Sequence, residues 1–254
     1  DFWQWAGIDI DPRGRVWMGT SPAGIIIYDP ANNSVNLPFP NGSVEQKDVS
    51  YENISLYCDK DGMVWSGFWS KKGIYQLIPF SPAAKHYTAD AGQVNGLHSK
   101  TVSNFINAGQ GTLWMGSPDG ISIFNPHTGF FDLVQVKDLP GIKRGSTLFP
   151  INIDTINKKA WILNFDEWEL FEMDLPSRKC RLVMYEDSNG HKVALKSVLA
   201  HHPQNMFARN YKDGCLIAAS LPGHQEILIA NNDGPATQKI LSFPGEPIDV
   251  SGVF

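Results

Sequence analysis

Several features that mark specialised classes of protein are missing from this sequence. No apolar run in the 254 residues approaches the roughly 18–20 residues that a membrane-spanning helix needs. Charged residues make up 19% of the chain, the net charge is −5, and Lys and Arg are scattered rather than gathered in a basic stripe. Because neutralising phosphates would require such a stripe, a nucleic-acid partner is not expected.

Cysteine is scarce, and so are the motifs of metal binding. The three cysteines, Cys58, Cys180 and Cys215, are far apart, and the chain has no Cys-x-x-Cys or Cys/His cluster of the kind that holds zinc. His201 and His202 are adjacent, but no carboxylate lies at ligand spacing from them. We therefore expect no metal and interpret the cysteines as buried free thiols.

Motifs of catalysis are missing as well. Neither a Gly-x-Ser-x-Gly elbow nor a Gly-rich phosphate-binding loop occurs in the sequence. Asp166 and Glu167 form a carboxylate pair, but neighbours in sequence are not thereby placed across a scissile bond. We expect no catalytic residue and no cofactor.

The sequence does contain a tandem repeat with a period near fifty residues. Its marker is a Trp that is usually followed by a small residue two positions later, and successive markers are separated by 48, 49, 47 and 55 residues. The marker positions are Trp17, Trp65, Trp114, Trp161 and Leu216. A Trp at one fixed strand position of every repeat is expected to pack between neighbouring repeats.

Each repeat has the composition of four short strands. An alternating segment ends in a turn such as Asp11-Pro12-Arg13-Gly14, in which Gly supplies a positive φ. The Trp segment follows, then a Ser/Pro/Gly-rich loop, a β-branched third segment, a turn such as Asp29-Pro30 and a more polar fourth segment. Four antiparallel strands per repeat, without helices, predict an all-β fold, a β-propeller of four-stranded blades.

The repeats define the expected organisation of the chain as one propeller segment spanning 1–254. We expect five blades followed by the inner strand of a sixth, and thus part of a propeller of about six to eight blades with its natural N-terminus removed. The alternative is a second small domain over 145–247, where the repeat is degenerate. The expected blades are 5–48, 51–97, 101–140, 145–190 and 197–245, and the further inner strand is 246–254.

The best-preserved copies carry a family resemblance. Residues 8–30 and 105–126, and to a lesser extent 54–78, contain an Asp-x-x-Gly-x-Val/Leu-Trp-Met-Gly-Thr/Ser unit followed by Gly-Ile and an Asp/Asn-Pro turn. This unit resembles the two-component regulator propeller repeat. In that family, such repeats form the extracytoplasmic sensor region of membrane histidine kinases, notably the hybrid sensors of Bacteroidetes, many of which respond to oligosaccharides.

The loops between the second and third strands are the expected binding positions, because they emerge on one face of a propeller. Trp69 and Trp168 lie in such loops, outside the marker position, and an aromatic face beside polar groups suits a sugar. Packing under the loop is the alternative for both. The candidate ligand-binding residues are Trp69, Lys71, Asp166, Trp168 and His224.

The resemblance implies a non-catalytic, ligand-sensing region of a two-component sensor histidine kinase. This region is expected to lie in the periplasm and to bind an oligosaccharide or another small molecule. It is expected to contact the membrane only through flanking segments. A homodimer is possible, since such kinases couple binding to changed pairing of their sensor regions. The alternatives are a propeller enzyme of the polysaccharide lyase or glycosidase type and a protein-binding scaffold.

Overall fold

The computed structural model is almost wholly β-structure. It describes residues 7–20, 24–38, 53–68, 73–77, 84–89, 95–109, 111–118, 120–135, 137, 139–186, 190–198, 205–211, 214–220, 226–231 and 239–242. The only α-helix in these ranges is the single turn α2 (Leu195–Val198), and no helix within them is long and apolar enough to cross a bilayer. The chain divides into two compact units, residues 1–134 and 135–254, which are described separately.

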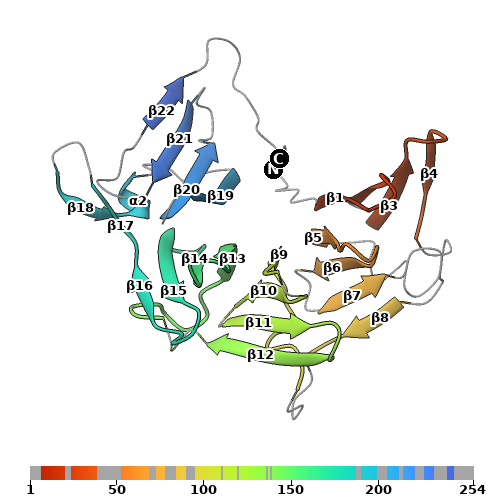
Figure 1. Ribbon diagram of the computed structural model, residues 1–254, viewed down its shortest axis with the longest axis horizontal. Helices are drawn as coiled ribbons and strands as arrows, with labels where there is room; N and C mark the ends of the chain where they lie inside the picture. Colours follow the sequence, from red (N-terminus) through yellow and green to blue (C-terminus); the bar gives the residue numbers. More distant parts are fainter. Residues whose placement is uncertain are drawn as a thin grey trace. The chain divides into compact units, whose positions relative to one another are not determined.

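Three four-stranded antiparallel sheets belong to the first unit, and the strands of each follow one another in chain order (Figure 1). The first sheet consists of β1 (Ile8–Ile10), β2 (Val16–Thr20), β3 (Gly24–Asp29) and β4 (Ser34–Asn36). The second consists of β5 (Asn53–Cys58), β6 (Val64–Phe68), β7 (Ile74–Leu77) and β8 (Ala84–Tyr87). The third consists of β9 (Asn104–Asn107), β10 (Leu113–Ser117), β11 (Gly120–Asn125) and β12 (Phe130–Gln135), whose last residue belongs to the second unit.

The second unit contains two more sheets of the same kind and an additional hairpin. The fourth sheet consists of β13 (Leu148–Asp154), β14 (Lys159–Asn164), β15 (Glu169–Asp174) and β16 (Cys180–Leu182). The hairpin of β17 (Met184–Glu186) and β18 (Lys192–Ala194) precedes α2. The fifth sheet consists of β19 (Asn205–Tyr211), β20 (Gly214–Ser220), β21 (Glu226–Asn231) and β22 (Lys239–Ser242).

The sheets therefore follow the repeat, including its two degenerate copies. Leu216 lies in the second strand of the fifth sheet, as Trp17 and Trp65 do in the first two. The β17–β18 hairpin was not expected from the sequence. The strand expected at 246–254 lies outside the described residues.

A buried hydrogen bond explains the constant spacing of Asp and Trp in the first two repeats. The carboxylate Oδ2 of Asp11 accepts a hydrogen bond from Trp17 Nε1 at 2.9 Å, and Oδ2 of Asp59 accepts one from Trp65 Nε1 at 3.1 Å. In each case Oδ1 accepts backbone N–H groups of the turn, from Arg13 and Arg15 in the first and from Asp61 and Met63 in the second. One aspartate therefore both shapes the turn and holds the indole.

The third and fourth sheets lack this hydrogen bond. Ala108 replaces the aspartate in the third repeat, where Asn107 Oδ1 accepts the N–H of Gly109 instead. In the fourth repeat the turn is one residue longer, and Asp154 accepts hydrogen bonds from Ile156 and Asn157. The indole N–H of the buried Trp161 then has no hydrogen-bond partner among the described residues.

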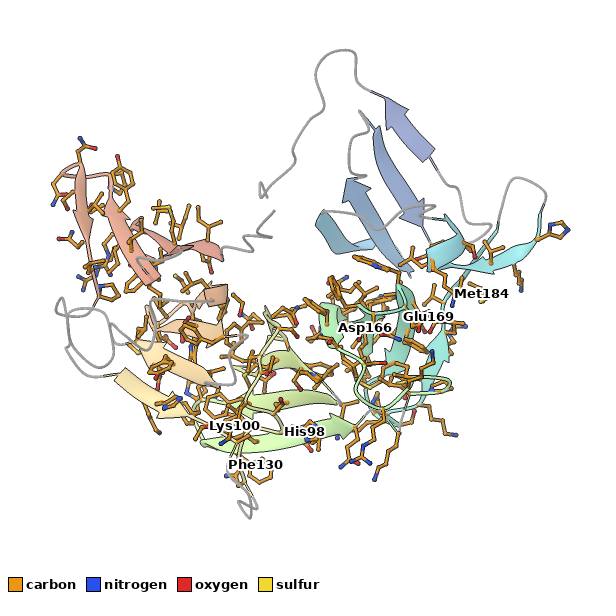
Figure 2. The ribbon with its side chains drawn as sticks, turned by 180° about the vertical axis from the view of Figure 1, so that it is seen from behind. His98, Lys100, Phe130, Asp166, Glu169 and Met184 are labelled. Atoms are coloured by element: carbon orange, nitrogen blue, oxygen red, sulfur yellow. The ribbon has the colours of Figure 1, made fainter. Side chains whose placement is uncertain are left out.

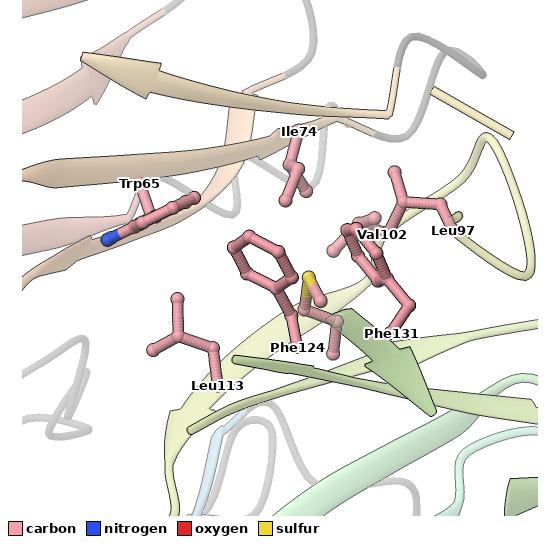
Figure 3. Close-up of a cluster of buried hydrophobic side chains, with 8 residues drawn as sticks. Trp65, Ile74, Leu97, Val102, Leu113, Phe124 and Phe131 are labelled. Carbon is pink, nitrogen blue, oxygen red and sulfur yellow. The ribbon is translucent and has the colours of Figure 1, made fainter. Parts of the chain in front are cut away.

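Neighbouring sheets of the first unit share apolar cores. Side chains of the first sheet, Trp17, Ile25 and Ile27, pack with Val64, Phe68, Tyr75 and Leu77 of the second. Side chains of the second sheet, Trp65 and Ile74, pack with Leu113, Met115, Phe124 and Phe131 of the third and with Leu97 and Val102 (Figure 3). The expectation that the repeated Trp packs between repeats is confirmed for Trp17 and Trp65.

The small residue after the repeated Trp is required by this packing. A Cβ atom on Gly67 would lie 2.7 Å from Ser55 Oγ and 3.0 Å from the side chains of Val102 and Phe105. The approach to Ser55 Oγ is closer than real Cβ atoms show, and those to Val102 and Phe105 are unusually tight, so a larger residue here would force these neighbours to shift.

The cysteines agree with the sequence analysis only in part. Among the described residues, Cys58 and Cys180 form no disulfide, but both are half-buried rather than buried as expected. Burial raises the pKa of Cys58 well above its usual range, and the negative charge of Asp9 raises it further. This thiol is therefore protonated and poorly reactive. The side chain of Cys215 lies outside the described residues.

We predict that Asp59→Ala lowers the free energy of unfolding by roughly 1–3 kcal/mol, because it leaves a buried indole N–H without an acceptor and removes two caps of the turn. Urea unfolding followed by Trp fluorescence measures this change. Asp61→Ala is the matched control, since Asp61 is exposed in the same turn and should change the free energy by less than about 0.5 kcal/mol. Equal effects of the two substitutions would contradict the structural role of Asp59.

We predict a loss of stability in acid that depends on Asp11. Burial alone would raise the pKa of Asp11, but hydrogen bonds from Trp17, Arg15 and Arg13 outweigh it and hold the pKa below the usual value. A carboxyl with a lowered folded-state pKa stabilises the fold above its unfolded pKa of about 3.9, and this contribution is lost as the pH falls through the folded-state pKa. Urea unfolding at pH 6 and below pH 3 should therefore show a smaller acid-induced loss in Asp11→Asn than in the parent.

Candidate functional site

Two of the five predicted ligand-binding residues, Asp166 and Trp168, are described by the structure. Both lie in the four-residue turn 165–168 that joins β14 to β15, closed by the pairing of Asn164 with Glu169. Trp69, Lys71 and His224 lie outside the described residues, so their roles stay predictions. The candidate site is therefore built around the β14–β15 turn of the second unit (Figure 2).

The buried side chain of Trp168 anchors this turn. Its backbone has φ of 51°, in the left-handed region that bulky residues rarely adopt. Its side chain is 7% exposed and packs in a cluster with Trp161, Leu163, Leu170, Val183, Tyr185 and Leu195. Burial of the indole compensates for the strained backbone. The geometry thus favours the packing alternative for Trp168 over contact with a ligand.

Thr147, just before β13, fixes the other side of the turn. Its carbonyl accepts a hydrogen bond from Phe165 N at 2.9 Å, and its own N–H donates to Asp166 Oδ2 at 2.6 Å. The Asp166 side chain is exposed, although one of its oxygens is held by this bond. No hydrogen bond to the second oxygen, Oδ1, arises from the described part of the chain. Asp166 thus presents an oriented carboxylate at the surface.

Aromatic rings form a continuous series that includes two residues of the turn, Phe165 and Trp168. The centroids of Phe149 and Phe165 lie 5.0 Å apart, and those of Phe165 and Trp168 lie 5.1 Å apart. Phe149 and Phe165 are only half-buried, whereas Trp168 is buried. Both phenylalanines also pack against the buried cluster around Trp168, so only the exposed part of each ring remains as aromatic surface.

Two ion pairs flank the turn. Glu167 pairs with Lys143 at 3.2 Å, and Glu169 pairs with Lys196 of α2 at 2.9 Å. The hydrogen bond and the charge of Glu169 raise the pKa of Lys196 above its usual value, so this lysine stays protonated. The ammonium groups partly balance the carboxylates without contacting Asp166 directly, and exposed pairs of this kind add little to stability.

This arrangement suits the recognition of hydroxyl-bearing ligands. A fixed carboxylate accepts hydrogen bonds from hydroxyl groups, and half-exposed rings pack against C–H groups. It offers no metal site, because the described residues contain no cluster of three His, Cys, Asp or Glu side chains. Sequence reasoning missed Phe149, Thr147, Lys143 and Lys196, which lie far from the turn in sequence, whereas the adjacent Phe165 could have been noticed.

Of the comparisons with known proteins, only the one with solved structures found matches. No family model and no curated protein matches the sequence. The extracellular domain assigned to a hybrid two-component system of Bacteroides thetaiotaomicron matches with a TM-score of 0.57, at 14% identity, over 95% of this chain and 36% of that chain. The extracellular domain assigned to a one-component system of the same organism matches with a TM-score of 0.53, at 14% identity, over 92% of this chain and 36% of that one.

A third solved structure that matches is the β-propeller domain of Cps50 (Swd1) from Myceliophteria thermophila. It has a TM-score of 0.55 and 10% identity, over 95% of this chain and 74% of that chain. Identities this low show the fold and nothing finer. Together with the five four-stranded sheets, they show that the chain has the β-propeller fold, as the sequence predicted. The chain spans about a third of the length of the two Bacteroides domains.

We predict that Trp168→Ala lowers the free energy of unfolding by roughly 3–5 kcal/mol, the usual cost of truncating a buried aromatic side chain. Urea unfolding followed by circular dichroism measures the change. Trp168→Phe serves as the control, because it keeps a ring in the cluster and should cost clearly less. A loss below about 1 kcal/mol in Trp168→Ala would show that the indole is not the anchor of the turn.

Proposed function

We propose that the chain is a ligand-sensing section of an extracytoplasmic sensor of the two-component type and that it binds an oligosaccharide at the β14–β15 turn. The observation that carries the proposal is the surface carboxylate of Asp166, held by Thr147 in the same turn as the half-buried ring of Phe165, which lies against Phe149. The extracellular sensor domains among the structural neighbours support it at the level of the fold.

The chemistry of the turn suits a sugar better than a charged or purely apolar ligand. Sugars combine hydroxyl groups with faces of C–H groups, and the turn supplies an acceptor and aromatic surface side by side. The two flanking ammonium groups, on Lys143 and Lys196, are already paired with Glu167 and Glu169, so they favour a neutral ligand over an anion. The other two carboxylates near the turn, on Glu167 and Glu169, are held in these ion pairs, and binding is proposed rather than cleavage.

In the parent protein, this section would act in signal transduction. A ligand bound outside the cytoplasm would shift the population of sensor conformations, in the periplasm of a bacterium, and a histidine kinase would report the change. A homodimer of sensor regions belongs to the same proposal, as does ligand contact by Trp69, Lys71 and His224.

A thermal-shift screen against plant and host oligosaccharides tests the proposal. A ligand at about a hundred times its dissociation constant should raise the melting temperature by roughly 5–10 °C, because it binds only the folded state. Asp166→Asn and Phe165→Leu should each remove most of this shift. Asp61→Asn, an exposed carboxylate in the first unit, is the matched control and should leave it intact.

Two results would contradict the proposal in different ways. The absence of any shift with any sugar would contradict oligosaccharide binding by this chain. A shift that survives Asp166→Asn and Phe165→Leu but is lost in Trp69→Ala would retain the sensor and move the site to the loop that contains Trp69.

A further inference from the structure

The fourth sheet carries its charges at opposite ends. In an antiparallel meander the β14–β15 turn lies at one end, and the β13–β14 and β15–β16 turns lie together at the other. The β14–β15 turn bears Asp166, Glu167 and Glu169, two of which Figure 2 labels. The opposite end, here called the basic end, bears five cations: Lys158, Lys159, Arg178, Lys179 and Arg181.

The two turns of the basic end form one continuous surface. The N–H of Leu175 in the second turn donates to the carbonyl of Lys158 in the first at 2.9 Å. Asp174 lies close enough to Lys158 and Lys179 for both charges to lower its pKa, in addition to the larger effect of its hydrogen bonds with Ser177. The cations of the two turns therefore act at one place rather than separately.

The carboxylates at this end are mostly withdrawn from the surface. Asp154 is 5% exposed and accepts hydrogen bonds from its own turn, and Glu172 is 9% exposed and pairs with Lys159 and Arg181. Asp174 remains exposed, with one oxygen bonded to Ser177. The cations Lys158, Arg178, Lys179 and Arg181 are all exposed, so the surface of this end is net positive although the whole chain has a net charge of −5.

An apolar side chain projects from one of the two turns that form this positive surface. Ile156, at the tip of the β13–β14 turn, is 89% exposed, the highest value among the exposed large apolar side chains of the described residues. The carboxylate of Asp154 accepts the N–H groups of Ile156 and Asn157, which holds the turn in its protruding form. Pro176, exposed on the adjoining turn, extends the apolar tip.

We propose that the basic end of the fourth sheet docks on an anionic lipid membrane, with Ile156 inserted among the headgroups and the exposed cations of the same end near the lipid phosphates. A protruding apolar side chain on a surface that also bears exposed cations fits a lipid surface, where apolar side chains reach below the headgroups and basic side chains stay at their level. The cations would also pair with an acidic protein partner, but the protruding side chain of Ile156 would then have no apolar pocket to enter.

The proposal does not rest on the proposed ligand. It adds a direct membrane contact of the sheet itself to the contact through flanking segments that the sequence analysis expected. Since the β14–β15 turn lies at the opposite end of the same sheet, docking at the basic end would leave that turn directed away from the lipid.

Co-sedimentation of the chain with lipid vesicles tests the proposal. Vesicles of phosphatidylcholine with 30% phosphatidylglycerol should bind the protein at low salt, vesicles of phosphatidylcholine alone should not, and added salt should weaken the binding. Lys158→Gln/Lys179→Gln should lower the partition coefficient about 25-fold, at roughly fivefold for each cation near an anionic surface. Ile156→Ser should lower it on the order of tenfold, because an apolar contact with the lipid is lost.

The matched control is Lys137→Gln/Lys192→Gln, which removes the same charge from exposed positions of the same unit outside the two turns and should change binding little. Failure to bind anionic vesicles at low salt would overturn the proposal, and so would equal binding by the parent and the basic-end variants. Binding of polyglutamate without binding of vesicles would overturn it in favour of an acidic protein partner.

Discussion

The contact between neighbouring sheets depends on a buried indole whose N–H is held by an aspartate from the same repeat. In the first two sheets, Asp11 and Asp59 each shape the turn that precedes the Trp strand and accept the hydrogen bond of the indole behind it. A Trp is large enough to fill the space between sheets, and its N–H usually finds an acceptor when it is buried. The aspartate supplies that acceptor, and in the first repeat it also binds the buried guanidinium of Arg15.

The repeats that lack the hydrogen bond between aspartate and Trp show which other interaction keeps the indole in place. Trp114 and Trp161 keep the same strand position although Ala108 replaces the aspartate in one repeat and a longer turn displaces it in the other. Packing alone therefore keeps the indole in place, and the aspartate adds stability and a defined orientation. This explains how the motif can degenerate along the chain while the four-stranded sheet persists.

The four-stranded sheets could be predicted from the sequence, because the turn residues and the spacing of the repeated Trp are local signals that recur along the chain. It was insufficient for the β17–β18 hairpin, which has no counterpart among the described residues of the other repeats. At the candidate site, Asp166 could be predicted from its loop position, but the bond from Thr147 and the ring of Phe149 come from a strand that precedes it by more than a dozen residues. The burial of Trp168 depends on a left-handed backbone that an isolated sequence does not reveal.

The way the β14–β15 turn is held has a consequence for how this protein can adapt. The backbone of the turn is fixed from below by the buried Trp168 and from the side by the main chain of Thr147, and neither anchor needs the exposed side chains of the turn, apart from one carboxylate oxygen. Exposed positions can therefore be exchanged with little effect on folding, much as the variable loops of a binding scaffold are. Related chains that share the anchor could thus diverge in what they recognise while conserving the sheet beneath.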